Sequence, residues 1–268
     1  MESRAMPIRT STLTTIVKGA IRRLLWQAGL DVHRRSGKFS YVDLSERIEP
    51  HIARTILRAA PYSMTGHPRL YVACKAAEHV VDARIPGAIV ECGVWRGGTM
   101  MAIAETLRHL GHTERELWLY DTFEGMTEPA RRDVGIGGVA ALPKWRAERA
   151  AGRRWIFASL DEVRSNMTST GYPSERTRFV VGDVGSTIPA QMPDQVAMLR
   201  LDTDWYESTL HELTYLYPRL SAGGVLIIDD YGCWEGARQA TDEYFAGLDQ
   251  RPFLVRVDYS CRVAIKPA

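Results

Sequence analysis

Cysteine is scarce in this 268-residue chain, and its four cysteines are far apart in the sequence. None of Cys74, Cys92, Cys233 and Cys261 forms a C-x-x-C pair, so the sequence favours neither a zinc site nor a disulfide framework. Free cysteines are typical of a reducing compartment, and we therefore expect a cytoplasmic protein.

The chain also lacks long apolar runs and a strong net charge. No run of about 18 apolar residues occurs, so we expect no transmembrane segment. A formal net charge of +2 gives no case for nucleic-acid binding. The 45% of hydrophobic residues is enough for one large α/β core. We expect residues 61–268 to form one catalytic domain and residues 1–60 to form an N-terminal helical extension.

The extension begins with a predicted amphipathic helix. Residues 14–30 place Ile16, Ile21, Leu24 and Leu25 near one face, with basic residues interrupting it. Such a helix could contact a membrane surface or an acidic partner. We expect it to pack on its own domain or on a second subunit, because isolated helices need such burial. The polar stretch R-R-S-G-K ends this segment.

Two short apolar runs each end in a pair of acids. V-A-M-L-R-L is followed by Asp202 and Asp204, and G-V-L-I-I by Asp229 and Asp230. Such runs predict buried parallel strands, joined by a crossover helix over residues 207–220. Because ligands bind at the carboxyl ends of strands in open α/β sheets, the four carboxylates should share one edge. Their charges would repel unless a cation neutralised them, and oxygen ligands suit Mg²⁺ or a similar ion.

A purely structural role is the alternative for each acid taken singly. An aspartate after a strand is often the N-cap of the next helix, and Asp204 before W-Y-E-S could be that alone. Two pairs of acids that end successive strands favour the metal site.

A glycine-rich turn follows the first predicted sheet strand, residues 88–92. The segment E-C-G-V-W-R-G-G-T lets the backbone pass close to a small ligand, with helix N–H groups facing an anion. Trp95 stands where the dinucleotide fingerprint has its second glycine and where a pyrophosphate needs room. This favours S-adenosylmethionine, whose one anion is a carboxylate, over NAD. The candidate contacts are Glu91, Gly93, Trp95 and Arg96.

Further candidate contacts follow the next two strands. Asp121 ends L-W-L-Y-D at the position of an acid that binds ribose hydroxyls, with a helix cap as the alternative. Asp183, beside Val184, is placed to accept from an adenine amino group. Ser159 caps a helix, with Glu162 three residues on. We include Asp121, Ser159, Asp183 and Val184 among the expected cofactor-binding residues.

Two connections are candidates to cover the site. The turn P-Y-S-M-T-G-H-P, between two predicted helices, is either an ordinary loop or a flap over the active site. Residues 122–157 show little periodicity besides a helix around residues 144–151. Long connections of this kind are commonly lids or binding loops.

Six motifs together resemble the macrocin O-methyltransferase (TylF) family of bacterial natural-product enzymes. They are P-Y-S-M-T-G, V-E-C-G-V-W-R-G-G-T, D-T-F-E-G-M, L-R-L-D-T-D-W-Y-E-S-T, L-Y-P-R-L-S-A-G-G and I-I-D-D-Y-G, in the order that the family has. The resemblance implies an α/β, Rossmann-like class I methyltransferase fold, with a mostly parallel seven-stranded sheet and helices on both faces. It also implies S-adenosylmethionine as donor, Mg²⁺ dependence and methylation of a hydroxyl, often on a sugar.

Carried over by position, the resemblance assigns roles to the acids. Asp202, Asp229 and Asp230 would bind the metal, and Asp204 would be the general base. Where the family usually has L-D-G-D, this chain has Thr203, which would place a methyl and a hydroxyl group beside the metal. The expected acceptor is a hydroxyl of a sugar or glycosylated small molecule, with a phenolic hydroxyl as second choice. We expect a homodimer, because lids of this kind often involve a second subunit.

A metal-dependent glycosyltransferase is the alternative from another class. An apolar run that ends in D-x-D is also how many such enzymes hold a metal against a nucleotide-sugar diphosphate. The glycine-rich turn followed by Asp121 argues against that alternative and favours a methyltransferase.

Overall fold

The computed structural model describes residues 30–35, 38–43 and 48–268, which fall into two compact units, 1–53 and 54–268. Residues 14–29 of the expected N-terminal helix lie outside the described residues. In the first unit, β1 (Leu30–Arg35) and β2 (Lys38–Asp43) form an antiparallel hairpin rather than a helix. The alternating pattern of K-F-S-Y-V-D favours a strand, a signal that is easily missed among the basic residues around it.

The centre of the second unit is a seven-stranded sheet with the order β10-β11-β9-β8-β3-β4-β7. Its strands are β3 (Ala88–Cys92), β4 (Leu117–Asp121), β7 (Thr177–Val181), β8 (Val196–Leu201), β9 (Leu220–Ile228), β10 (Val255–Arg256) and β11 (Arg262–Ile265). β3, β4, β7, β8 and β9 are parallel, whereas β11 pairs antiparallel with β9 and β10. The predicted mostly parallel sheet is confirmed.

The strand order reverses between β3 and β8. The chain adds β4 and β7 on one side of β3 and then returns to add β8 and β9 on the other. In open α/β sheets, the crevice for ligands lies at the carboxyl ends of the strands at such a switch point. The residues that directly follow β3, β8 and β9 are therefore the ones that the topology brings together.

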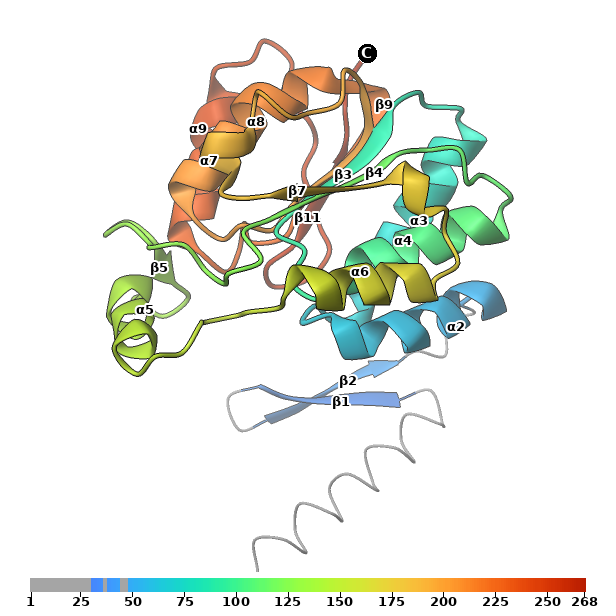
Figure 1. The fold of residues 1–268 in the computed structure, drawn as a ribbon. Coiled ribbons are helices and arrows are strands. Elements are labelled where there is room, and N and C mark those ends of the chain that lie inside the picture. The colour runs from blue at the N-terminus through green and yellow to red at the C-terminus, as the bar shows by residue number, and fades with distance from the viewer. Residues whose placement is uncertain (1–29, 36–37, 44–47) are drawn as a thin grey trace, which may run out of the picture. The chain divides into compact units, whose positions relative to one another are not determined.

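Helices cover both faces of the sheet, as Figure 1 shows. One face carries α3 (His67–Asp82), α4 (Gly98–His109) and α6 (Leu160–Ser169), and the other carries α7 (Val184–Thr187), α8 (Tyr206–Leu216) and α9 (Glu235–Ala246). The remaining elements are α2 (Pro50–Ala59), β5 (Val134–Gly135), β6 (Val139–Ala140), α5 (Ala141–Ala150) and the short 3₁₀ helices Ala60–Tyr62, Ser174–Arg176 and Tyr217–Arg219. No described helix has both the length and the hydropathy needed to cross a bilayer.

Side chains of the central strands alternate between two buried layers. On β3, Ile89 belongs to the layer under α3 and α4, whereas Val90 and Cys92 belong to the layer under α8. This alternation follows from the two-residue period of a strand. All five residues of β3 are buried, so Glu91 lies in the sheet interior and needs a partner for its charge.

Candidate active site

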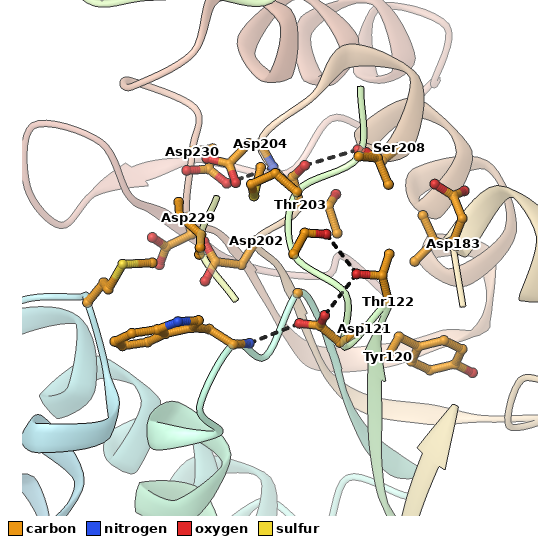
Figure 2. Close-up of a pocket in the computed structure, with 18 of the residues that line it drawn as sticks. Tyr120, Asp121, Thr122, Asp183, Asp202, Thr203, Asp204, Ser208, Asp229 and Asp230 are labelled. Carbon is orange, nitrogen blue, oxygen red and sulfur yellow. Dashed lines mark hydrogen bonds between the residues drawn. The ribbon is translucent and has the colours of Figure 1, made fainter. Parts of the chain in front are cut away.

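The acids that follow β8 and β9 meet at the carboxyl edge of the sheet. Leu201 lies opposite Ile228 at the ends of these parallel neighbours, and the Asp229 amide donates to the Leu201 carbonyl at 2.9 Å. One carboxylate oxygen each from Asp202, Asp229 and Asp230 lies within 4.8 Å of the others. Figure 2 shows these acids grouped with Asp204 at one end of the cavity. The strand ends thus converge as their positions in the sequence predicted.

Asp204 joins this group through its backbone. Its amide donates to Asp230 Oδ2 at 3.2 Å, and its φ of +66° lies in the left-handed region. Burial, together with the charge on Asp202, raises the pKa of Asp204 to about 8. A carboxyl group that titrates near neutral pH is suited to accept a proton in a reaction.

A different acid satisfies the first helical amide of α8. The N-cap residue of α8 is Trp205, and the Tyr206 amide donates to Asp133 Oδ1 at 2.9 Å. Asp133 lies in the connection after β4 and is 1% exposed. The helix-cap alternative for Asp204 therefore has no support in this geometry.

Two arginines lie among the acids, and neither was among the predicted site residues. Arg200, within β8, pairs with Glu91, with Asp202 at 2.8 Å and with Asp229 Oδ1 at 2.7 Å. Arg69, on α3, pairs with the other oxygen of Asp229 and with Asp258 at 2.7 Å. Part of the charge of the acid cluster is therefore neutralised by arginines of the protein, so a bound cation is not needed to neutralise all of it. The signal for Arg200 was a charged residue inside an apolar strand, L-R-L.

The donor set still fits a hard divalent cation. The four aspartates and Glu91 outnumber Arg69 and Arg200, so the two arginines cannot neutralise all five acids once these are ionised. Burial and the neighbouring acids raise the pKa values of Asp202 and Asp230 well above the ordinary range, as expected for crowded carboxylates. The converging atoms are all carboxylate oxygens, the ligands that Mg²⁺ prefers.

The turn after β3 forms the neighbouring wall of the cavity. Gly93 has a φ of +81°, and a Cβ there would lie 2.0 Å from the Asp202 carbonyl oxygen. Asp121 Oδ2 accepts from the amides of Val94 and Trp95 at 2.9 and 3.0 Å. Trp95 has a φ of +48°, so it adopts a conformation that usually favours glycine. Asp121 thus shapes the turn, besides any contact with a cofactor.

Most of the predicted site residues line one cavity. They are Gly93, Trp95, Asp121, Asp183, Val184, Asp202, Asp204, Asp229 and Asp230. Asp183 lies apart from the other acids (Figure 2), and its Oδ1 accepts from the Gly185 amide at 2.7 Å at the start of α7.

Three predicted cofactor residues do not line this cavity. Glu91 pairs with Arg200. Arg96 pairs with Glu162 at 2.5 Å, and Ser159 accepts from the Glu162 amide at 3.2 Å as the N-cap of α6. The predicted cap is confirmed, whereas direct contact of these three residues with a cofactor stays a prediction.

Both connections that were candidates to cover the site contribute to the cavity. Met64 and Thr65 of the P-Y-S-M-T-G turn line it, as do Met126, Thr127 and Ile156 from the connection after β4. The turn-rich composition of P-Y-S-M-T-G was the sequence signal that made this segment a candidate to cover the site. Other lining residues that were not predicted are Tyr120, Thr122, Gly125, Gly182 and Ser208.

A tryptophan cluster ties the connection after β4 to the acid loops. Trp205 follows Asp204, and its ring centroid lies 5.9 Å from Trp155 and 5.0 Å from Trp234. The Trp205 indole N–H also donates to the Thr127 carbonyl at 3.3 Å. The predicted lid segment is thus packed against the chain immediately beside the acids.

Thr203, at the position of the family's usual glycine, directs its hydroxyl to α8. It donates to Glu212 Oε1 at 2.9 Å. Glu212 is fully buried, and burial raises its pKa to about 8. The hydroxyl therefore binds a helix residue rather than an acid of the cluster.

Comparison with known proteins identifies the family. The chain matches the macrocin-O-methyltransferase (TylF) family over residues 40–264. It belongs to this family. Proteins similar to this chain include demethyldecarbamoylnovobiocin O-methyltransferase of Streptomyces niveus, 36% identical over 227 residues, 84% of this chain and 83% of the relative.

A second relative and a solved structure are also similar to this chain. The 8-demethyl-8-(2,3-dimethoxy-alpha-L-rhamnosyl)-tetracenomycin-C 4'-O-methyltransferase of Streptomyces olivaceus is 37% identical over 183 residues, 68% of this chain and 67% of the relative. The structure of the O-methyltransferase NovP has a TM-score of 0.67 and 34% identity, and the match covers 77% of this chain and 83% of that one. The protein is an S-adenosylmethionine-dependent O-methyltransferase with the class I fold.

Proposed function

We propose that this TylF-family protein methylates a hydroxyl of a sugar or glycosylated small molecule, with a divalent cation such as Mg²⁺ and with Asp204 as general base. The observation that carries the proposal is the position of Asp204 beside three converging carboxylates in the cavity next to the glycine-rich turn. The sugar acceptor is supported by the rhamnosyl group in the name of the Streptomyces olivaceus relative.

The turn after β3 and the two acids beyond it would bind the cofactor. When bound, S-adenosylmethionine supplies a methyl group on a positively charged sulfur, which leaves as a neutral thioether. The N-terminus of α4, which begins at Gly98, suits its carboxylate. Asp121 accepts from the amides of Val94, Trp95 and Phe123 and, at 3.5 Å, from the Thr122 hydroxyl. A ribose hydroxyl would replace the long contact with Thr122, whose hydroxyl also donates to the Gly125 carbonyl at 2.8 Å.

Asp202, Asp229 and Asp230 would hold the cation. When bound, a divalent ion would lower the pKa of the acceptor hydroxyl, which is otherwise a poor nucleophile at neutral pH. Asp204 then takes the proton of that hydroxyl as the O–CH₃ bond forms and the S–CH₃ bond breaks. The cavity walls align oxygen, carbon and sulfur, and such positioning can supply about 7–11 kcal/mol.

Calorimetry separates the proposal from the glycosyltransferase alternative. S-adenosylhomocysteine should bind the purified protein and UDP should not, because the Gly93 turn suits a carboxylate better than a diphosphate. Binding of UDP with no response to S-adenosylhomocysteine would contradict both the family activity and the proposed chemistry.

An acceptor screen with a labelled methyl donor tests the substrate and the metal together. We expect transfer to a glycosylated acceptor, and a loss of about 100-fold in rate when excess EDTA removes the cation, since metal activation is worth several kcal/mol. Full activity in EDTA would count against the metal. Transfer to phenols alone would refute the sugar acceptor. A homodimer stays a prediction, which gel filtration of the full chain tests.

A further inference from the structure

Arg200 joins the strand of the glycine-rich turn to the acids after β8 and β9. Its side chain is 3% exposed, and its Nη1 pairs with Glu91 on β3. Its Nη2 is shared between Asp202 Oδ2 at 2.8 Å and Asp229 Oδ1 at 2.7 Å. One guanidinium group therefore contacts acids from three neighbouring strands, and two of them belong to the converging set.

The burial of Arg200 requires an explanation, because a buried charge is costly. Taking an ion out of water costs several kcal/mol, which only close and well-oriented partners offset. A guanidinium presents its donors in a rigid planar fork, so it can hold several carboxylates in fixed relative positions. A lysine at the same place would supply the charge without the fork.

Glu91 completes this arrangement from the other side. It is 1% exposed, its Oε1 accepts from Arg200, and its Oε2 has no hydrogen-bond partner among the described residues. Glu91 does not line the cavity. The Glu91 carboxylate therefore binds Arg200, which in turn binds Asp202 and Asp229.

We propose that Arg200, anchored by Glu91, is a positioning residue that holds Asp202 and Asp229 at the spacing needed to bind one divalent cation. The inference rests on the metal site of the proposed function, and it adds Arg200 on β8 and Glu91 on β3 as the residues that support this site. If the guanidinium only neutralised acid charge, removing it would raise the metal affinity. If it positions the metal ligands, removing it lowers the metal affinity, so the two roles predict opposite results.

The test is direct Mn²⁺ binding to the full chain, measured by electron paramagnetic resonance, with S-adenosylhomocysteine binding measured by calorimetry. Arg200→Lys keeps the charge and loses the fork, and we expect Mn²⁺ affinity to fall about 10–100-fold, the usual effect of losing a group that orients metal ligands. Arg200→Met should also bind Mn²⁺ more weakly than wild type. S-adenosylhomocysteine affinity should stay within about threefold, roughly 0.7 kcal/mol.

Two outcomes would overturn the positioning role. Unchanged Mn²⁺ affinity in Arg200→Lys, or tighter binding in Arg200→Met, would show that only charge matters. Wild-type protein that binds S-adenosylhomocysteine but no Mn²⁺ would refute the metal site itself, and this inference with it. Arg178→Lys is the matched control, because Arg178 pairs with Glu116 at 3.0 Å on the exposed surface between β4 and β7. It should leave both affinities unchanged.

Glu91→Gln keeps the test informative if the Arg200 variants do not fold. The glutamine retains the shape and one acceptor but removes the charge that anchors Arg200, so Mn²⁺ affinity should fall while S-adenosylhomocysteine affinity holds. The reverse pattern, weaker S-adenosylhomocysteine binding with normal Mn²⁺ affinity, would place Glu91 in the cofactor site and overturn the proposal.

Discussion

The turn after β3 and the acid loops after β8 and β9 are neighbouring walls of one cavity, yet different forces hold them. The turn depends on backbone geometry, because Gly93 lies against the Asp202 carbonyl and the amides of Val94 and Trp95 donate to Asp121. The acid loops depend on charge, because Arg200 and Arg69 bind their carboxylates.

The difference indicates what each wall responds to. The turn should tolerate a change of ion but not an added Cβ, since steric overlap does not depend on charge. The acid loops bring together more carboxyl groups than arginines in the described part of the chain, and they should respond strongly to cations and pH. The wall formed by the turn after β3 is thus shaped before a ligand binds. The wall formed by the acid loops after β8 and β9, the acid wall, is completed by the ion that binds there.

Removing the proposed base should give the largest effect on the acid wall. Asp204→Asn preserves the shape but cannot take the proton, so turnover should fall about 10²–10⁴-fold, the usual contribution of a general base. S-adenosylhomocysteine affinity, measured by calorimetry, should not change, because the turn after β3 is untouched. Asp194→Asn, at a fully exposed aspartate, is the control. Near-normal turnover in Asp204→Asn would eliminate the base.

Adding one methyl group to the turn should break the other wall. Gly93→Ala places a Cβ 2.0 Å from the Asp202 oxygen, so we expect both weaker S-adenosylhomocysteine binding and lower unfolding free energy. The positive φ alone costs roughly 1–3 kcal/mol.

A second glycine isolates the steric part of that loss. Gly111 has a φ of +78°, and a Cβ added there would meet no atom of the described residues within 4 Å, so Gly111→Ala carries the conformational cost without the overlap. The two variants are compared by urea unfolding. Equal destabilisation would mean that the contact between Gly93 and Asp202 is unimportant.

The same contrast explains what the sequence could predict. The strands and the acids at two strand ends follow from apolar runs and connection lengths, which are local properties. The cap at Ser159 follows from a short motif and is present. The hairpin over β1 and β2 was missed because its basic residues concealed the alternation of K-F-S-Y-V-D.

The side-chain partners in the acid wall could not be predicted in the same way. Arg69 lies 160 residues from Asp229 in the sequence, and their pairing requires α3 to be placed beside β9. Glu91 looked like a cofactor residue because it begins the glycine-rich motif, whereas its partner is Arg200. Partners of this kind depend on packing across strands rather than on spacing along the chain.

The last expected effect is a pH dependence that involves Asp204 and the buried Glu212 beside Thr203. Burial raises the pKa values of Asp204 and Glu212 to about 8, above their ordinary values of 3.8 and 4.5. Between about pH 4 and 8 the folded protein keeps protons that the unfolded chain has lost, so stability without metal falls as pH rises. A bound cation offsets the repulsion of the ionised acids, so its stabilising effect should be larger at the upper end of that range.

Thermal unfolding in EDTA and in saturating Mg²⁺, across the same pH range, measures both parts. Glu212→Gln removes an acid that pairs with Thr203 rather than with the cluster, so it should weaken the pH dependence but preserve the added stability from Mg²⁺. Asp230→Asn should reduce the Mg²⁺ increment, because Asp230 supplies one of the converging oxygens. A pH dependence in EDTA that is the same in wild type, Asp204→Asn and Glu212→Gln would contradict the raised pKa values assigned to these two acids.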